Sequence, residues 1–279
     1  MLKKLVLTGA AGTLGHVLRQ PLSEMCETLV TTDIADGLRD AALPNETYHK
    51  ADLGQLDQVL PLLEGADMVV HFGAIGDEAP WEQILNSNIV GAYTVWEAAY
   101  RQGVRRVVYA SSIHAVGMHP KTDALDGSER HRPDTYYGLA KCFAEDLASL
   151  YWDKRGVESV CMRILSCQPE PANARALGTW LSYDDLTRMV QAAITSPTTG
   201  FSIVWGVSAN DRAPVSNARA AFLGYRPQDN AEDHAPRILA KAAPMDPQNP
   251  EDMCHGGPFA VVPLGESGVE MIKARSVSQ

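Results

Sequence analysis

Residues 3–18 read KKLVLTGAAGTLGHVL, an apolar run followed by three glycines and then by a second apolar pattern. We predict a buried strand at Leu5 to Leu7 and a helix at Thr13 to Met25, which places the glycines on the turn between them. Glycine inside a regular element costs stability, so three at fixed spacing indicate a backbone that must come close to another group. The free N–H groups and the dipole of a helix that begins at such a turn favour a pyrophosphate.

Each glycine of this turn has its own predicted task. Gly9 would allow the tight turn, Gly12 the close approach of a bound group, and Gly15 the tight packing of helix on strand. Thr13 and Leu14 belong to the same candidate cofactor-binding segment. The spacing is G-x-x-G-x-x-G rather than the G-x-G-x-x-G of the standard dinucleotide fingerprint, and on its own a simple packing turn would also account for it.

A carboxylate at the end of the second predicted strand, Thr28 to Thr32, strengthens the dinucleotide interpretation. Asp33 follows the glycine turn by about twenty residues, where a carboxylate can accept hydrogen bonds from both ribose hydroxyls of an adenosine. A 2′-phosphate would be repelled there, so the sequence predicts NAD rather than NADP. A solvated loop aspartate is the alternative for Asp33 taken alone.

The composition excludes several classes of protein. The chain has 279 residues, 45% of them hydrophobic and 21% charged, and its formal net charge of −10 argues against a general nucleic-acid surface. No window has the roughly eighteen uninterrupted apolar residues of a membrane span, and no signal peptide is visible, so we expect no membrane partner. Five scattered cysteines predict free thiols in a reducing cytoplasm. No cysteine or third histidine completes a metal site around His114 and His119, which favours structural or substrate-contact roles for both.

Strand-like and helix-like patterns alternate over residues 1–165, which predicts repeated βαβ units, a doubly wound parallel sheet and a single α/β domain. Residues 166–234 are less regular and are predicted to form a small lobe of substrate-covering segments over the carboxyl edge of the sheet. Residues 235–279 are rich in Pro, Asp and Gly and are predicted to be an extended or partly disordered tail. The helices Trp81 to Arg101 and Thr135 to Lys154 have broad apolar faces, which either core packing or pairing between subunits would explain.

A candidate catalytic group combines one strand end and one helix. Tyr137 and Lys141 are spaced i, i+4 and therefore share a helix face, where the ammonium and a cationic nicotinamide ring can together lower the high pKa of the phenol and make it a base. Ser112 follows the predicted strand Val104 to Ala110, at the edge where parallel sheets bind ligands. Each feature occurs by chance, as a packed tyrosine or a turn serine, and only their combination is informative. Tyr136 is the weaker candidate base.

These motifs together resemble the extended short-chain dehydrogenase/reductase family, in matching order over about the first 165 residues. The resemblance implies a Rossmann-type fold, bound NAD and a catalytic set of Ser112, Tyr137 and Lys141. It places further residues at the cofactor: Asp52, Leu53, Gly73, Ala74 and Asn88, with Tyr137 and Lys141 again among the contacts. For Asp52 a turn, and for Asn88 a buried helix amide, are the alternatives.

Longer stretches, including SSIHAVGMHP, YYGLAKCFAEDL and RILSCQPEP, are similar to the uronate dehydrogenases, a compact branch of that family. The resemblance implies oxidation of galacturonate or glucuronate at C1 to an aldarolactone, commonly by a homo-oligomer. It places the following residues at the sugar: Ile75, Gly76, Ser112, Ile113, His114, Ser166 and Arg175. A guanidinium at Arg175 suits a carboxylate because it can form two parallel hydrogen bonds, although a surface arginine is the alternative.

Two departures from that branch remove polar groups. Ile113 stands where an asparagine is usual and Gly76 where a serine is expected, so we expect altered sugar specificity. Two other functions stay open on the sequence: a nucleotide-sugar epimerase or dehydratase of the same superfamily, and a non-catalytic NAD-sensing protein.

Overall fold

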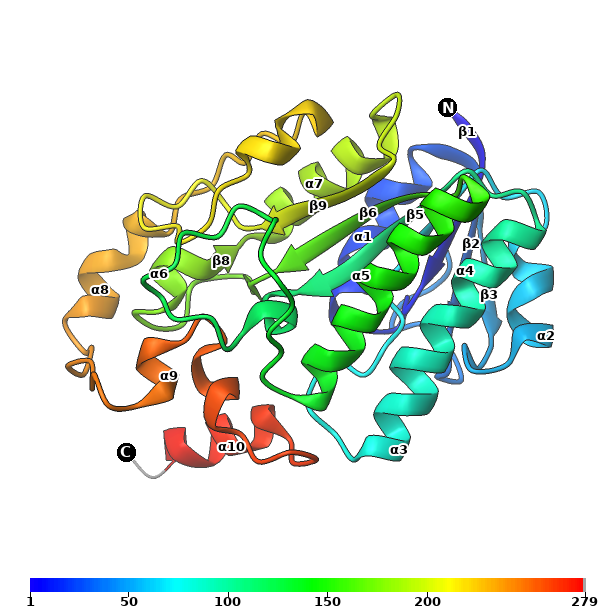
Figure 1. The fold of residues 1–279 in the computed structure, drawn as a ribbon. Coiled ribbons are helices and arrows are strands. Elements are labelled where there is room, and N and C mark those ends of the chain that lie inside the picture. Colours follow the sequence, from blue (N-terminus) through cyan, green and yellow to red (C-terminus); the bar gives the residue numbers. More distant parts are fainter. Residues whose placement is uncertain (278–279) are drawn as a thin grey trace.

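Seven parallel strands form one sheet in the computed structural model, which describes residues 1–277 (Figure 1). The strands lie in the order β3-β2-β1-β4-β5-β6-β9. Their bounds are β1 Leu2–Thr8, β2 Cys26–Asp33, β3 Glu46–Lys50, β4 Met68–His71, β5 Arg106–Ser112, β6 Glu158–Ile164 and β9 Phe201–Gly206. The chain starts at β1 in the middle of the sheet and adds β2 and β3 on one side of it. It then crosses back and adds β4 and the later strands on the other side of β1. The carboxyl ends of all seven strands meet at one edge, and the point of reversal on that edge is where open α/β sheets bind ligands.

Alternate residues of each strand face opposite layers of helices. On β1, Leu5 and Leu7 pack with α1 (Thr13–Ser23) and α7 (Tyr183–Thr195). Val6 faces the other way, toward α2 (Leu56–Val59), α4 (Gly91–Arg101) and α5 (Tyr136–Arg155). Figure 1 shows α4 and α5 side by side on one face of the sheet. Burial of the strands on both faces explains their continuous apolar runs and confirms the predicted doubly wound α/β fold.

Local sequence sets the ends of the long helix α5. The Thr135 hydroxyl accepts a hydrogen bond from the Gly138 N–H at 3.0 Å and so caps the first turn. Gly156 ends the helix with a φ of 69°, a left-handed conformation that glycine adopts without strain. The start of α5 is therefore fixed at the residue before Tyr136.

The helix before α4 contains a wider turn. Helix α3 (Trp81–Ile84) continues into a π-helical turn at Leu85–Val90 and then into α4 without a break. Such turns are rare and are frequent at functional sites. Here the turn carries the buried Asn88 toward the carboxyl edge of the sheet.

A lobe gathers at the carboxyl edge, as the strand arrowheads in Figure 1 show. It contains the two-stranded sheet of β7 (Ser166–Cys167) and β8 (Trp180–Leu181), helix α6 (Ala176–Thr179) and a 3-10 turn at Ala231–His234. A second 3-10 turn, Ala218–Leu223, packs instead on β9 and the sheet core.

The prediction of an extended tail from residue 235 is wrong for its described part. The tail forms α8 (Ala235–Leu239), α9 (Pro250–Met253), a 3-10 turn at Gly257–Val261 and α10 (Gly268–Val277). Several contacts distant in sequence hold it: the Gly256 N–H donates to the Gly117 carbonyl at 2.8 Å, the Gly265 N–H donates to Glu78 at 2.8 Å, and the Gly268 N–H donates to Asp77 at 3.0 Å. Its short turns are held by contacts distant in sequence, which a polar and proline-rich composition does not reveal.

Candidate active site

The glycine turn presents the start of α1 to an open cavity. Gly9 has a φ of 75°, and a Cβ there would meet the backbone of Phe72 and Gly73 at 2.6–2.7 Å. A Cβ on Gly15 would overlap the Gly9 carbonyl oxygen. Gly12 is the N-cap and provides no side-chain cap, so the first N–H groups of α1 remain available to a ligand.

Two cavities share this turn. The first, about 420 Å³, is lined by Gly9, Gly12, Thr13, Leu14, Gly15, Ala74, Gly76, Ser112, His114, Tyr137 and Lys141 together with five other residues. The second, about 380 Å³, is lined by Gly9, Gly12, Asp33, Asp52, Leu53, Gly73, Ala74 and Ile75 together with seven others. Most of the predicted site residues, drawn from five strand ends and two helices, therefore lie in one continuous region.

Asp33 is held at the end of β2 by the backbone. Its carboxylate accepts hydrogen bonds from the Ala11 N–H at 3.0 Å and the Ala35 N–H at 3.2 Å. The nearby Asp52 carboxylate accepts the Gly54 N–H at 2.8 Å. Both carboxylates retain further acceptor capacity toward the second cavity.

Asn88 lines neither cavity. Its side-chain amide makes two hydrogen bonds of 2.9 Å with the backbone of Ile75, accepting from the N–H and donating to the carbonyl. Asn88 thus fixes the loop after β4, which supplies Gly73 to Gly76 to the cavities.

The first cavity brings together the side chains of Tyr137, Lys141 and Ser112. The Lys141 ammonium donates to the Ala110 carbonyl at 2.7 Å and lies 5.2 Å from the centroid of the Tyr137 ring. Ser112 at the end of β5 hydrogen bonds the Tyr137 phenol. The i, i+4 spacing therefore brings the two side chains together as predicted.

The expected low pKa of the phenol is not found in the protein alone. Burial raises the pKa of Tyr137 to about 12, and its hydrogen bond with Ser112 offsets only part of this effect. Burial also lowers the pKa of Lys141 to about 7. A site that excludes water disfavours both charged forms, which is why Lys141 by itself does not activate the phenol.

His114 is held on three sides. Its Nδ1 lies 2.7 Å from Asp134 Oδ2, and the side chains of the pair are 13% and 0% exposed. Its ring stacks on Phe259 of the tail, with centroids 4.2 Å apart, and meets the Tyr137 ring edge to face at 5.7 Å.

Ser166 and Arg175 contact each other but line neither of the two cavities. Arg175 donates from Nη1 to the Ser166 hydroxyl at 3.1 Å and from Nη2 to the His255 carbonyl at 2.8 Å. Its Nε is buried without a hydrogen-bond partner. Burial lowers the pKa of Arg175 to about 10. Arg175 also lines a third cavity, of about 590 Å³, together with Lys121.

Ile113, a further predicted sugar contact, has its side chain in the apolar interior. Its side chain is 1% exposed in an apolar cluster with Val116, Leu125, Trp205 and Val207 and lines neither cavity. The short 3-10 turn Ile113–Val116 directs this side chain into the lobe rather than toward the cavity.

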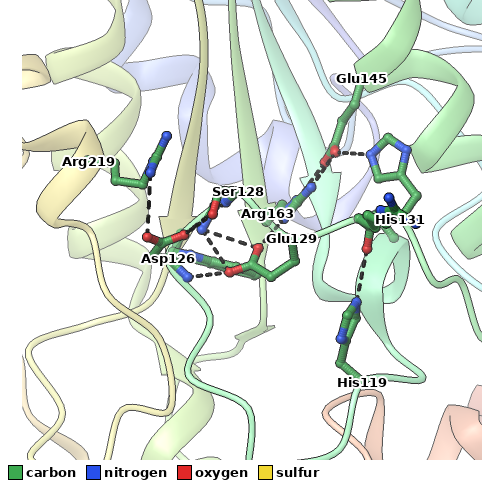
Figure 2. Close-up of polar contacts among 12 residues, drawn as sticks. His119, Asp126, Ser128, Glu129, His131, Glu145, Arg163 and Arg219 are labelled. Carbon is green, nitrogen blue, oxygen red and sulfur yellow. Dashed lines mark hydrogen bonds and ion pairs between the residues drawn. The ribbon is translucent and has the colours of Figure 1, made fainter.

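A buried ion-pair network supports the loop that carries His114 (Figure 2). Glu145, on the same helix as Tyr137, pairs with Arg163 of β6 at 2.8 Å and with His131 of the loop at 2.8 Å. The other side of the Arg163 guanidinium meets Glu129 at 3.0 Å. Ser111, next to Ser112, donates to Glu145 at 2.5 Å.

Sequence reasoning missed Asp134, Phe259 and Glu78. Asp134 lies directly before the capping Thr135, where the pattern suggests only a helix start. Glu78 accepts the Tyr137 N–H at 2.8 Å, and no local motif marks it. Phe259 lies in a segment without periodicity.

Within residues 1–277 no cluster of three or more His, Cys, Asp or Glu side chains is placed to hold a metal ion. The described helices include none of sufficient length and apolarity to span a membrane.

Comparison with known proteins gives consistent matches. Residues 5–167 match the NAD dependent epimerase/dehydratase family. A uronate dehydrogenase of Pseudomonas syringae pv. tomato is 42% identical over 264 residues, covering 94% of this chain and 95% of that protein. The uronate dehydrogenase of Agrobacterium fabrum is 43% identical over 263 residues, covering 94% and 98%. The solved structure of a mutant uronate dehydrogenase from Agrobacterium tumefaciens, complexed with NAD, has a TM-score of 0.90 at 42% identity and covers 94% of this chain and 98% of that one.

Proposed function

The chain belongs to the NAD dependent epimerase/dehydratase family and, within it, to the uronate dehydrogenases, and we infer that it oxidises a hexuronate at C1 with NAD as the electron acceptor. The substrate is D-galacturonate or D-glucuronate and the product the aldarolactone. One observation carries this conclusion: a single cavity joins the glycine turn to Ser112, Tyr137 and Lys141.

The residues present fit a dinucleotide. Because Gly9, Gly12 and Gly15 have no side chains, the backbone and the start of α1 reach the cavity surface, where N–H groups favour a pyrophosphate. Asp33, Asp52 and Leu53 would hold the adenosine half, and Gly73, Ala74, Tyr137 and Lys141 the nicotinamide half. When bound, NAD supplies the hydride acceptor and a positive charge beside the phenol.

We assign the proton transfer to Tyr137. Ser112 would orient the anomeric hydroxyl, and the Tyr137 phenolate would take its proton as the C1–H bond breaks. Because burial alone raises the pKa of this phenol to about 12, ionisation requires positive charge from the bound cofactor in addition to Lys141. Lys141, anchored on the Ala110 carbonyl, also positions the first turns of α5.

We assign the uronate carboxylate to Arg175 with Ser166. Arg175 has a buried, unpartnered Nε that packs against Gly257, and its Nη1 donates to the Ser166 hydroxyl. Ser166 directly follows Leu165, which lines the first cavity. His114, Ile75 and Gly76 would form the remaining sugar wall. A charged carboxylate would replace the weak contact between Arg175 and the Ser166 hydroxyl.

The remaining proposals concern organisation. Residues 1–165 form the cofactor core and residues 166–234 cover the substrate, to which the folded tail adds a third part. We propose a cytoplasmic enzyme, consistent with five free cysteines. We also propose a homo-oligomer that pairs through the outer faces of α4 and α5, where Tyr93, Tyr100, Leu139, Phe143 and Leu150 are exposed.

The reaction is tested by NADH absorbance after mixing the protein with NAD and galacturonate, with galactose as the uncharged control. We expect NADH with the uronate only. Isomerisation of a UDP-sugar without net NADH would instead identify an epimerase. Tight NAD binding without turnover of any sugar would identify a sensing protein.

The role of Tyr137 is tested by Tyr137→Phe, with Tyr136→Phe as the matched control. Tyr136 packs on Trp81 with ring centroids 5.4 Å apart. Tyr137→Phe should lower kcat by at least about a hundredfold and leave NAD affinity unchanged, whereas Tyr136→Phe should retain turnover. Retained activity in Tyr137→Phe would remove it as the base.

A further inference from the structure

We propose that Asp134 is the positioning residue of His114: it fixes the imidazole in the tautomer that carries its proton on Nδ1, so that Nε2 faces the sugar as a hydrogen-bond acceptor. This inference rests on the proposed function, because it concerns how the same site holds its substrate. Nothing in the sequence pattern singles out Asp134.

The contact itself determines the tautomer. Asp134 Oδ2 and His114 Nδ1 are 2.7 Å apart. An ionised carboxylate only accepts hydrogen bonds, so the proton between them belongs to Nδ1. Among the described residues no arginine or lysine nitrogen lies within 4.0 Å of this carboxylate, and His114 is its one ion-pair partner. In the neutral imidazole Nε2 is then without a proton.

Three glycines leave the room that the Asp134 carboxylate and the adjacent His114 backbone occupy. A Cβ on Gly117 or on Gly256 would overlap Asp134 Oδ2, and a Cβ on Gly138 would overlap the His114 carbonyl oxygen. Three segments, namely the turn after β5, the start of α5 and the tail, thus approach one another around Asp134. This arrangement requires glycine at all three positions.

The ring has no freedom to present another edge. Phe259 covers one face, the Tyr137 ring lies at 5.7 Å, and Nδ1 is held by Asp134. Because His114 lines the first cavity, the edge that remains for a ligand is the one carrying Nε2. An unprotonated nitrogen at that point selects a hydroxyl that donates, so it discriminates against a deoxy or O-methyl sugar.

The test is Asp134→Asn, in which the rest of the network decides the orientation of the new amide. Thr135 Oγ1 accepts from the Gly138 N–H and donates to Asp134 Oδ1 at 3.0 Å, so the amide oxygen takes that position. The amide NH₂ then faces Nδ1, which must become an acceptor, and the proton moves to Nε2. The substitution therefore reverses the polarity of the edge that meets the sugar at nearly constant shape.

The first readout is the ¹⁵N spectrum of the imidazoles, which reports the tautomer without any turnover. The chain has eight histidines, and His114→Gln identifies the relevant signal by its loss. We expect Nδ1–H in the wild type and Nε2–H in Asp134→Asn. An Nε2–H tautomer in the wild type, or the same tautomer in both proteins, would overturn the proposal.

The second readout is kinetic. Asp134→Asn should raise KM for the uronate by roughly 10- to 100-fold with a smaller change in kcat and unchanged NAD affinity. In a His114→Ala background the same substitution should have little further effect, because Asp134 acts through His114. An equal loss in both backgrounds would mean a merely structural carboxylate and would also contradict us.

Asp123→Asn is the matched control. Asp123 pairs with His119 at 3.2 Å in the same loop but is 46% exposed and lines neither the first nor the second cavity. It should leave both KM and the His114 signal unchanged. If the wild type turned over no uronate while its spectrum still showed Nδ1–H, the proposed function would fail and the tautomer assignment would stand.

Discussion

Gly76 leaves part of the cavity wall empty. A Cβ built there meets no atom within 4 Å, and its φ is not in the left-handed region. The resemblance to the uronate dehydrogenases leads us to expect a serine at this position. The site therefore has room for a hydroxyl that this chain lacks.

Gly76→Ser should restore one hydrogen bond to the sugar. We expect KM for the uronate to fall by roughly three- to tenfold, with kcat little changed, because the new hydrogen bond would hold the bound sugar and the transition state equally. Steady-state kinetics with galacturonate measures this. Gly37→Ser, on an exposed loop with equally open space, is the control and should change nothing. An unchanged or higher KM in Gly76→Ser would show that the sugar does not reach this wall.

The two departures noted in the sequence have different outcomes. Gly76 lies in the cavity, but Ile113 is buried in the lobe. The resemblance to the uronate dehydrogenases predicted a sugar contact for both Ile113 and His114, and of these two His114 lines the cavity. Which way a side chain turns after a strand end depends on the turn that follows, and one sequence does not contain that information.

Helix α5 joins the reacting groups to the support of the site. Tyr137, Lys141 and Glu145 follow one another at four-residue spacing, so they form a single stripe. The spacing of the first two is visible in the sequence and predicted their proximity. The role of Glu145 is not visible, because its partners Arg163 and His131 come from a strand and a loop distant in sequence.

The ion pair of His131 predicts a pH dependence of stability. The hydrogen bond from His131 to Glu145 raises the pKa of His131 above its ordinary value of 6.5, and partial burial opposes this effect. Because the folded protein holds the His131 proton more tightly than the unfolded chain does, the ion pair contributes its full stabilisation below about pH 6.5, the pKa of an unfolded histidine. That stabilisation is lost as the pH rises through the pKa of His131 in the folded protein.

The free energy of unfolding of the wild type, relative to His131→Gln, should therefore be higher by about 1 kcal/mol near pH 6 and lose that advantage toward about pH 8. Urea unfolding at both pH values measures it. His49→Gln, on exposed β3, should show no such trend. An advantage that grew with pH would contradict the assigned pair.

Over the whole molecule, periodicity predicted the regular part and failed for the tail. Strands and helices up to Gly206 bury one or both faces. Burial of a face requires apolar residues at regular spacing, and this spacing can be recognised in the sequence. The tail instead docks through single contacts, such as Gly265 on Glu78 and Phe259 on His114. No local pattern accompanies contacts of that kind.

The outer face of α4 and α5 predicts the assembly state. Leu150 is 51% exposed there, among the aromatic side chains proposed to pair between subunits. Leu150→Glu should shift the protein from an oligomer to a monomer, because it places a charge in an apolar interface. Light scattering during size exclusion measures the mass. Leu239→Glu, at 44% exposure on α8, is the control and should leave the mass unchanged, and a monomeric wild type would refute the interface.

The position of the tail in the chain bears on how the enzyme matures on the ribosome. All seven strands of the main sheet have been synthesised by Gly206, whereas Gly256, which packs on Asp134, and Phe259, which stacks on His114, are made about fifty residues later. A nascent chain could therefore complete its nucleotide half first. Selectivity for the sugar would then be acquired last, in one of the final events of translation.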